Sequence, residues 1–146
     1  MSQHLPFRLA LLCMLCLCGT SRAAETHWCG LVRAHPVDAA FALALERSGG
    51  VTVEIRDAQA SAYAGWDAEL NRLYRLLMKH LGSGAAADAL RQAQRAWLAW
   101  DDAELASDTA LAGDGGSAGP ITVADQAIAR RRARACTFQN LLAGEG

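Results

Sequence analysis

The chain has 146 residues, of which 52% are hydrophobic and 20% are charged, and its formal net charge is −1. This length suits one domain. The near-neutral charge argues against a nucleic-acid-binding protein, because such proteins gather an excess of basic residues on one face.

Residues 1–23 are predicted to be a cleaved export signal. Arg8 supplies positive charge ahead of an unbroken apolar run over residues 9–18, and Ser21 and Ala23 are small residues of the kind found at a cleavage site. The apolar run is too short for a stable membrane span. We therefore expect a periplasmic or secreted protein that has no membrane span once the signal is removed.

The main alternative is a lipid anchor on Cys16 or Cys18. Against it, Leu17 stands where a lipoprotein signal has a small residue before Cys18. We therefore favour cleavage over lipidation. Removal of residues 1–23 takes away Arg8 and Arg22 and no acidic residue, so 12 basic and 15 acidic residues remain and the net charge becomes −3.

Of the five cysteines, only Cys29 and Cys136 lie beyond the predicted signal. Two cysteines in an oxidising compartment form one disulfide most simply. We predict that this bond ties the N-terminal segment to the last helix. A metal site made of His27, Cys29 and His35 is the alternative, but nothing nearby completes the ligand set, so we expect no metal and no cofactor.

Two helices are predicted in the first half of the chain. The first begins at Pro36, which suits a first helical turn, and continues to Arg47 before a Ser-Gly-Gly stop. The second covers residues 53–81 with Thr52 as its cap. Its apolar residues are spaced by three, four and seven, which places them on one face; they are Ile55, Ala62, Trp66, Leu70, Leu73, Leu77 and Leu81.

Two more helices are predicted after the Gly82-Ser83-Gly84 turn. The third covers residues 85–111 with Ser83 as cap, and its apolar arc ends at Trp100 and continues as carboxylates. A glycine-rich loop over residues 113–120 follows. Thr122 and Asp125 resemble a capping box that starts a fourth helix, which ends near Leu142. Its expected inner face consists of Ile128, Ala135, Phe138 and Leu142, with Arg132 among them.

These elements predict an all-α fold, a small bundle of about four helices built around a long antiparallel helical hairpin. The two central helices form the hairpin because the turn between them is short. Pairing them about Ser83 places Trp66 opposite Trp100 and Asn71 near Gln94. We interpret the polar side chains of this hairpin as mutual hydrogen-bond partners that fix its register.

An enzyme would use Asp67, Asp101 or Asp102 as acid and base, as glycosidases do. The sequence contains no phosphate loop, zinc-helix motif or nucleophile elbow beside them. We therefore expect no catalytic residues and a protein that is not an enzyme.

The acidic stretch on the third helix has two interpretations. It consists of Asp101, Asp102, Glu104, Asp108 and Asp114. These carboxylates can pair with the Arg130–Arg134 stretch of the fourth helix, where an inward-facing arginine needs an acid. Alternatively, the exposed part attracts a basic protein and speeds its association.

A combination of two motifs resembles the lysozyme inhibitor LprI-like family of small exported helical domains. The first motif has an Asp, a Leu, an Asn and a Tyr on the second helix, and the second has Ala-Gln and a Trp on the third, followed by Asp-Ala-Glu. The matching residues are Asp67, Leu70, Asn71, Tyr74, Gln94, Trp97 and Asp102. Residues 52–117 carry the resemblance best, and residues 24–146 would form a single domain of this kind.

The resemblance implies an extracytoplasmic protein that binds lysozyme and inhibits it by covering its cleft, without turnover. The alternative is a structural or assembly module that binds another envelope protein. The family signature residues are expected to be structural, whereas Trp100, Asp101, Glu104 and Asp108 are the candidate partner-binding residues. Relatives favour an arginine where this chain has Asp101, so we expect Asp101 to pair with Arg132.

Overall fold

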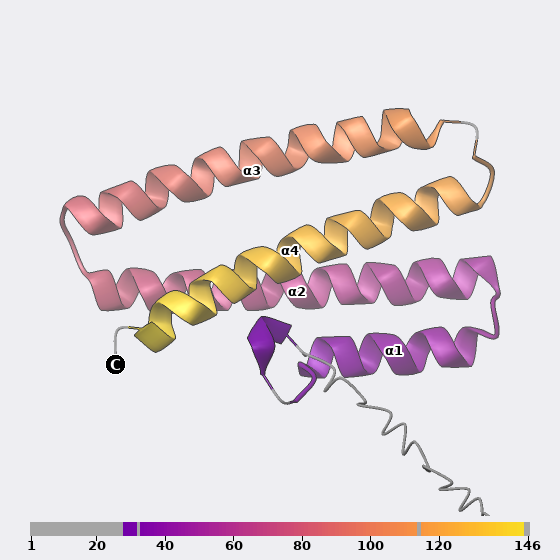
Figure 1. Cartoon of the computed structure of the whole chain (residues 1–146), viewed down its shortest axis with the longest axis horizontal. Helices are drawn as coiled ribbons and strands as arrows, with labels where there is room; N and C mark the ends of the chain where they lie inside the picture. The colour runs from indigo at the N-terminus through magenta and orange to yellow at the C-terminus, as the bar shows by residue number, and fades with distance from the viewer. Residues whose placement is uncertain (1–27, 32, 114, 145–146) are drawn as a thin grey trace, which may run out of the picture.

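The computed structural model describes residues 28–31, 33–113 and 115–144. These ranges contain no strand and confirm the all-α prediction. The elements are η1 (Trp28–Gly30), α1 (Pro36–Ser48), α2 (Thr52–Leu81), α3 (Ala85–Ala112) and α4 (Ala118–Gly144) (Figure 1). The predicted export signal (residues 1–23), His27 and Asp114 lie outside the described residues.

Figure 1 shows α2 and α3 running in opposite directions on either side of the 82–84 turn, as expected of a hairpin. α4 lies along α3 and then crosses α2, and α4 contacts α2 far more extensively than α3 does. α1 folds back along the first half of α2. Within the described ranges, no helix is both long enough and apolar enough to cross a membrane.

The composition of the hydrophobic core explains why α4 packs against α2. The apolar stripe of α2 is buried at Trp66, Leu70, Leu73 and Leu77, and the stripe of α4 that meets it consists of Ile128, Ala135 and Phe138. The α2 residues repeat every three or four positions, and the α4 residues share one face on which Arg131 lies between Ile128 and Ala135. The two faces are matched in length and cover each other.

The direct pairing of α2 with α3 is therefore corrected. Trp66 is fully buried and lies against the rings of Trp28 and His35, at centroid distances of 5.4 and 4.4 Å. Trp100 on α3 is 47% exposed. The first half of α4 lies between α3 and α2 (Figure 1), so along that stretch residues at matching heights on α2 and α3 are kept apart.

The expected helix caps are corrected as well. Val51 precedes α2 and Gly84 precedes α3, and neither helix has a side-chain cap. α4 starts earlier than expected, at Ala118, with Pro120 in its first turn. Proline has no N–H to leave unpaired there, and its fixed φ angle is helical. Thr122 therefore lies within the helix, where its hydroxyl donates to the Ala118 carbonyl over 3.1 Å.

Gly65 on α2 sets the distance between α1 and α2. A Cβ atom added to Gly65 would lie 3.0 Å from Cγ2 and 3.1 Å from Cγ1 of Val37 on α1. Val37 is β-branched and stiff, so it would have little freedom to move aside. The absence of a side chain at Gly65 therefore lets α1 approach α2 closely at this point.

Candidate functional site

A network of charged side chains, here called the arginine seam, joins α2, α3 and α4. Arg130 donates from Nε to Asp101 Oδ1 over 2.8 Å and from Nη1 to Asp108 Oδ2 over 2.6 Å. Arg131 donates to the other oxygen of Asp101. The seam comprises Tyr63, Asp67, Asp101, Asp108, Arg130 and Arg131.

Arg131 is the centre of the seam because it connects its own helix, α4, to both α2 and α3. Its Nη2 donates to the Tyr63 hydroxyl over 2.6 Å, and its Nε lies 3.1 Å from Asp67 Oδ1. Its guanidinium also lies over the Trp97 ring, 5.1 Å from the centroid. Arginine suits this position because its planar group binds carboxylates and stacks on aromatic rings at the same time.

The paired charges of the seam are largely removed from solvent, except for Asp67, which is half exposed. Asp101 is 4% exposed and Arg131 is 7% exposed. Burial works against the charge of Arg130, but the hydrogen bonds to Asp108 and Asp101 outweigh it and raise the pKa of Arg130. Buried charges are tolerated only when paired, so Asp67, Asp101 and Asp108 act as counter-ions that hold α3 and α2 to α4.

The expected partner of Asp101 was wrong, although the expected pairing of the acidic stretch with the arginines of α4 is confirmed for Asp101 and Asp108. Arg132 binds Asp38 of α1 instead, over 2.9 Å. The reason is helical spacing. Arg131 follows the buried Ala127 by four residues and precedes the buried Phe138 by seven, which places it on the buried face, whereas Arg132 is offset from both and lies to one side.

The family signature residues take separate structural places. Asn71 donates to the backbone and side-chain oxygens of Asp67 in its own helix, and Gln94 accepts from Arg134 Nε over 3.0 Å. Their partners are therefore different from the ones expected. Leu70 is buried, Tyr74 lies 5.8 Å from the Phe138 ring, and Asp102 is exposed on α3.

One flank of α3 is open to solvent and carries an aromatic and acidic surface. The buried residues of α3 are Ala87, Gln94 and Asp101, spaced by seven, so this helix packs along a single line. Beside that line lies the Trp100 flank, in which Trp100 and Leu111 are exposed and Trp97 and Glu104 are half-buried. Trp100 lies next to Trp97, at a centroid distance of 6.5 Å, and Leu111 is 84% exposed.

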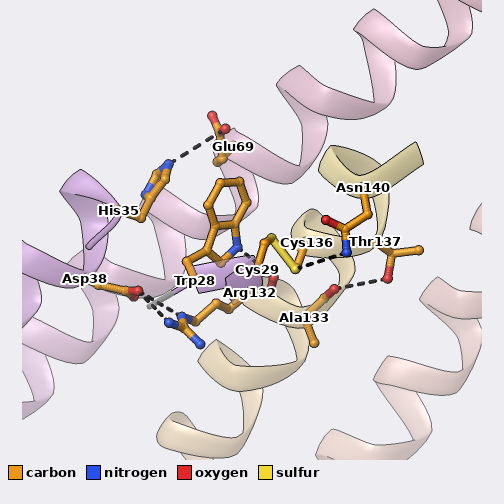
Figure 2. Close-up of a disulfide and its surroundings, with 10 residues drawn as sticks. All are labelled: Trp28, Cys29, His35, Asp38, Glu69, Arg132, Ala133, Cys136, Thr137 and Asn140. Carbon is orange, nitrogen blue, oxygen red and sulfur yellow. Dashed lines mark hydrogen bonds and ion pairs between the residues drawn. A yellow bond between two sulfur atoms is a disulfide. The ribbon is translucent and has the colours of Figure 1, made fainter. Parts of the chain in front are cut away.

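The second cluster surrounds the disulfide. Cys29 and Cys136 are bonded, which confirms the predicted pair and joins η1 to α4 (Figure 2). The neighbouring Trp28 is buried, and its indole N–H donates to the Arg132 carbonyl over 3.4 Å. The cysteine count beyond the predicted signal indicated the bond, but nothing in the irregular lead-in predicted that Trp28 would enter the core.

His35 connects this cluster to α1 and α2. Its Nδ1 accepts from the Val37 backbone N–H over 3.2 Å and so caps α1, while its Nε2 lies 3.7 Å from Glu69 on α2 (Figure 2). Asp38 accepts from the buried Trp66 indole over 3.1 Å and binds Arg132. The cluster therefore fixes the N-terminal segment against α2 and α4.

Glu69 makes stability depend on pH. A hydrogen bond from Arg72 lowers the pKa of Glu69 against the opposing effect of burial, and the charges of Arg72 and His35 lower it further. A carboxyl whose pKa is lowered by folding stabilises the fold above its unfolded pKa of about 4.3. That contribution is lost as the pH falls through the folded pKa.

We therefore expect Glu69→Gln to lower the melting temperature at neutral pH by up to about 4 °C, since an ion pair whose arginine is half exposed contributes ~1 kcal/mol at most. The difference from the unmodified protein shrinks below about pH 4. Circular-dichroism melts at both pH values measure it. Glu46→Gln, on the exposed surface of α1, is the matched control, and a Glu69→Gln difference that grew in acid would contradict the sign.

Comparison with known proteins gives one result, a match between the chain and a protein-family model. The model described as "Lysozyme inhibitor LprI" matches residues 45–137, which extend from the end of α1 through α2, α3 and most of α4. No curated protein and no solved structure matches the chain. The matched residues make up more than half of the 146-residue sequence. The chain therefore belongs to the LprI lysozyme inhibitor family.

Proposed function

We propose that this protein is an extracytoplasmic binding protein that inhibits lysozyme without catalysis, by covering the cleft of that basic enzyme. The main support for this proposal is the family match over residues 45–137, which includes all of α3 and its exposed surface. The predicted export signal and the net charge of −3 without it agree with this role.

The Trp100 flank is the surface we assign to the partner. An exposed tryptophan beside a carboxylate suits an interface, because aromatic anchors dominate binding energy and acids speed association with a basic protein. Trp100 and Glu104 supply these two properties. Asp101 is buried and Asp108 is bound to Arg130, so we assign both the task of holding α3 in place.

A lysis assay tests the proposed function. The purified protein is mixed with c-type lysozyme, and the clearing of a cell-wall suspension is followed. We expect the rate of lysis to fall with rising protein concentration and to level off near one equivalent. Undiminished lysis at a large molar excess would exclude lysozyme inhibition.

A second candidate function is that of an assembly module that binds another envelope protein. It is supported by exposed leucines on the opposite side of α3. Leu98 and Leu105 are 42% and 41% exposed there, at a spacing of seven that places them in one line. Co-purification from the cell envelope separates the two functions. Recovery of one non-lysozyme protein, lost in a Leu98→Ala/Leu105→Ala variant, would favour the assembly module.

A further inference from the structure

A groove lies between α1 and α2, on the part of the molecule remote from α3. Its volume is about 540 Å³, within the range of roughly 300–1,000 Å³ seen for ligand sites. Val37, Phe41 and Ala44 of α1 form one wall. Ala58 and Ala62 form part of the other, on α2.

The groove forms because small side chains face each other across the interface between α1 and α2, where the two helices are held close together. Val37 packs on Gly65 at one end and fixes the separation of α1 and α2 there. Further along, alanines at positions 44 and 58 are too small to fill the space between the helices. Phe41 is only partly buried, so its ring contributes apolar surface to the groove.

One end of the groove is acidic. Glu54 and Asp57 line it where α2 leaves the turn that follows α1. Both are exposed. Among the residues that the structure describes (28–31, 33–113 and 115–144), neither makes an ion pair or a side-chain hydrogen bond. Arg56 is adjacent in sequence but lines a different hollow, between α2 and α4, so its side chain does not compensate them in the groove.

We propose that this groove binds an apolar segment of a partner protein that carries a lysine or arginine at the end facing Glu54 and Asp57. The α1 wall from Pro36 to Ala44 is about 12 Å long at 1.5 Å per residue, enough for roughly two turns of a helix. Apolar side chains would enter the groove, and the basic group would meet two uncompensated carboxylates.

The charges favour this occupant over two others. An anionic lipid surface would be repelled by Glu54 and Asp57. A second copy of this chain brings a net charge of −1, or −3 without the predicted export signal, so its overall charge is repelled by an acidic end. The α1 wall precedes residue 45, where the family match begins. The α2 wall, with Glu54 and Asp57, lies within the match, but the groove shares no lining residue with the Trp100 flank, so the two sites can be tested separately.

A synthetic peptide provides the probe. It has about 12 residues, a leucine face at helical spacing and two lysines at one end, and its binding to the full chain is measured by fluorescence anisotropy. Filling the groove with Ala44→Phe, or removing its charge with Glu54→Gln/Asp57→Asn, is expected to weaken binding at least about tenfold. Glu46→Gln, an acid of α1 outside the groove, is the matched control and leaves affinity unchanged.

Additional control experiments distinguish binding in the groove from binding elsewhere on the protein. A peptide with glutamates in place of the lysines should bind at least about tenfold more weakly, and Trp100→Ala should bind the lysine peptide normally. Melting curves check that the variants fold, and Ser61→Leu fills the groove from α2 should Ala44→Phe unfold. No binding, or equal binding by the filled and charge-free variants, would overturn the proposal. So would self-association that the filled variant loses, which would assign the groove to a second copy.

Discussion

Replacing Cys29 with serine is expected to lower the free energy of unfolding by about 4–5 kcal/mol, the largest effect of a single change in this chain. The bond closes a sequence separation of 107 residues, and the chain-entropy relation gives ~5 kcal/mol for a loop of that length. It also holds η1 in place, so that Trp28 packs against Trp66.

Urea unfolding under non-reducing conditions measures this effect. Cys136→Ser and the double variant should match Cys29→Ser, because each lacks the same bond. A reducing agent should destabilise the unmodified protein to the same extent and leave the variants unchanged. Equal unfolding midpoints for the unmodified protein and Cys29→Ser would contradict the tethering role.

Removal of the Asp101 carboxylate is the second change with a large effect. Asp101→Ala leaves the buried Arg131 without its closest carboxylate and deprives Arg130 of one of two partners. Breaking a buried ion pair from one side costs about 3–5 kcal/mol when the remaining charge has no other counter-ion. Asp67 stays beside Arg131 and Asp108 beside Arg130, which places the effect at the lower end of that range. We expect a loss of this size in the free energy of unfolding, with α3 separating from α4 first.

The neighbouring Asp102 is a close control for this experiment. It is exposed on the same helix, so Asp102→Ala should change stability by less than about 0.5 kcal/mol. Combining Asp101→Asn with Arg131→Met removes both charges of the pair and should recover part of the loss. An Asp101→Ala protein as stable as Asp102→Ala would show that the seam does not hold α3.

Much of the fold could be predicted because periodic apolar residues dominate it. The spacing from Trp66 to Leu77 defines a helix with one buried face whatever covers that face. It does not say which helix covers it, since α3 and α4 both offer an apolar stripe. The short turn at residues 82–84 suggested that α3 covers the apolar face of α2. In the structure α4 covers it, because Ile128, Ala135 and Phe138 pack against that face.

The candidate site was less predictable for similar reasons. The acidic stretch and the arginine run indicated an ion-pair network, but choosing Arg131 over Arg132 required Ala127 and Phe138 to be recognised as part of the buried face of α4. The burial of Trp28 depends on the disulfide and on contacts with α2 and α4, which are distant in sequence. No local pattern in the lead-in carries that information.

A direct binding titration tests the central claim, that the Trp100 flank of this LprI family member binds lysozyme. Calorimetric titration of the protein with c-type lysozyme should give a saturable one-to-one complex. Trp100→Ala should weaken it by at least about tenfold, because buried tryptophans contribute 2 kcal/mol or more at interfaces. Leu98→Ala, an equally exposed residue on the opposite side of α3, should leave it intact. Absence of a complex, or identical affinities for the Trp100→Ala and unmodified proteins, would contradict the claim.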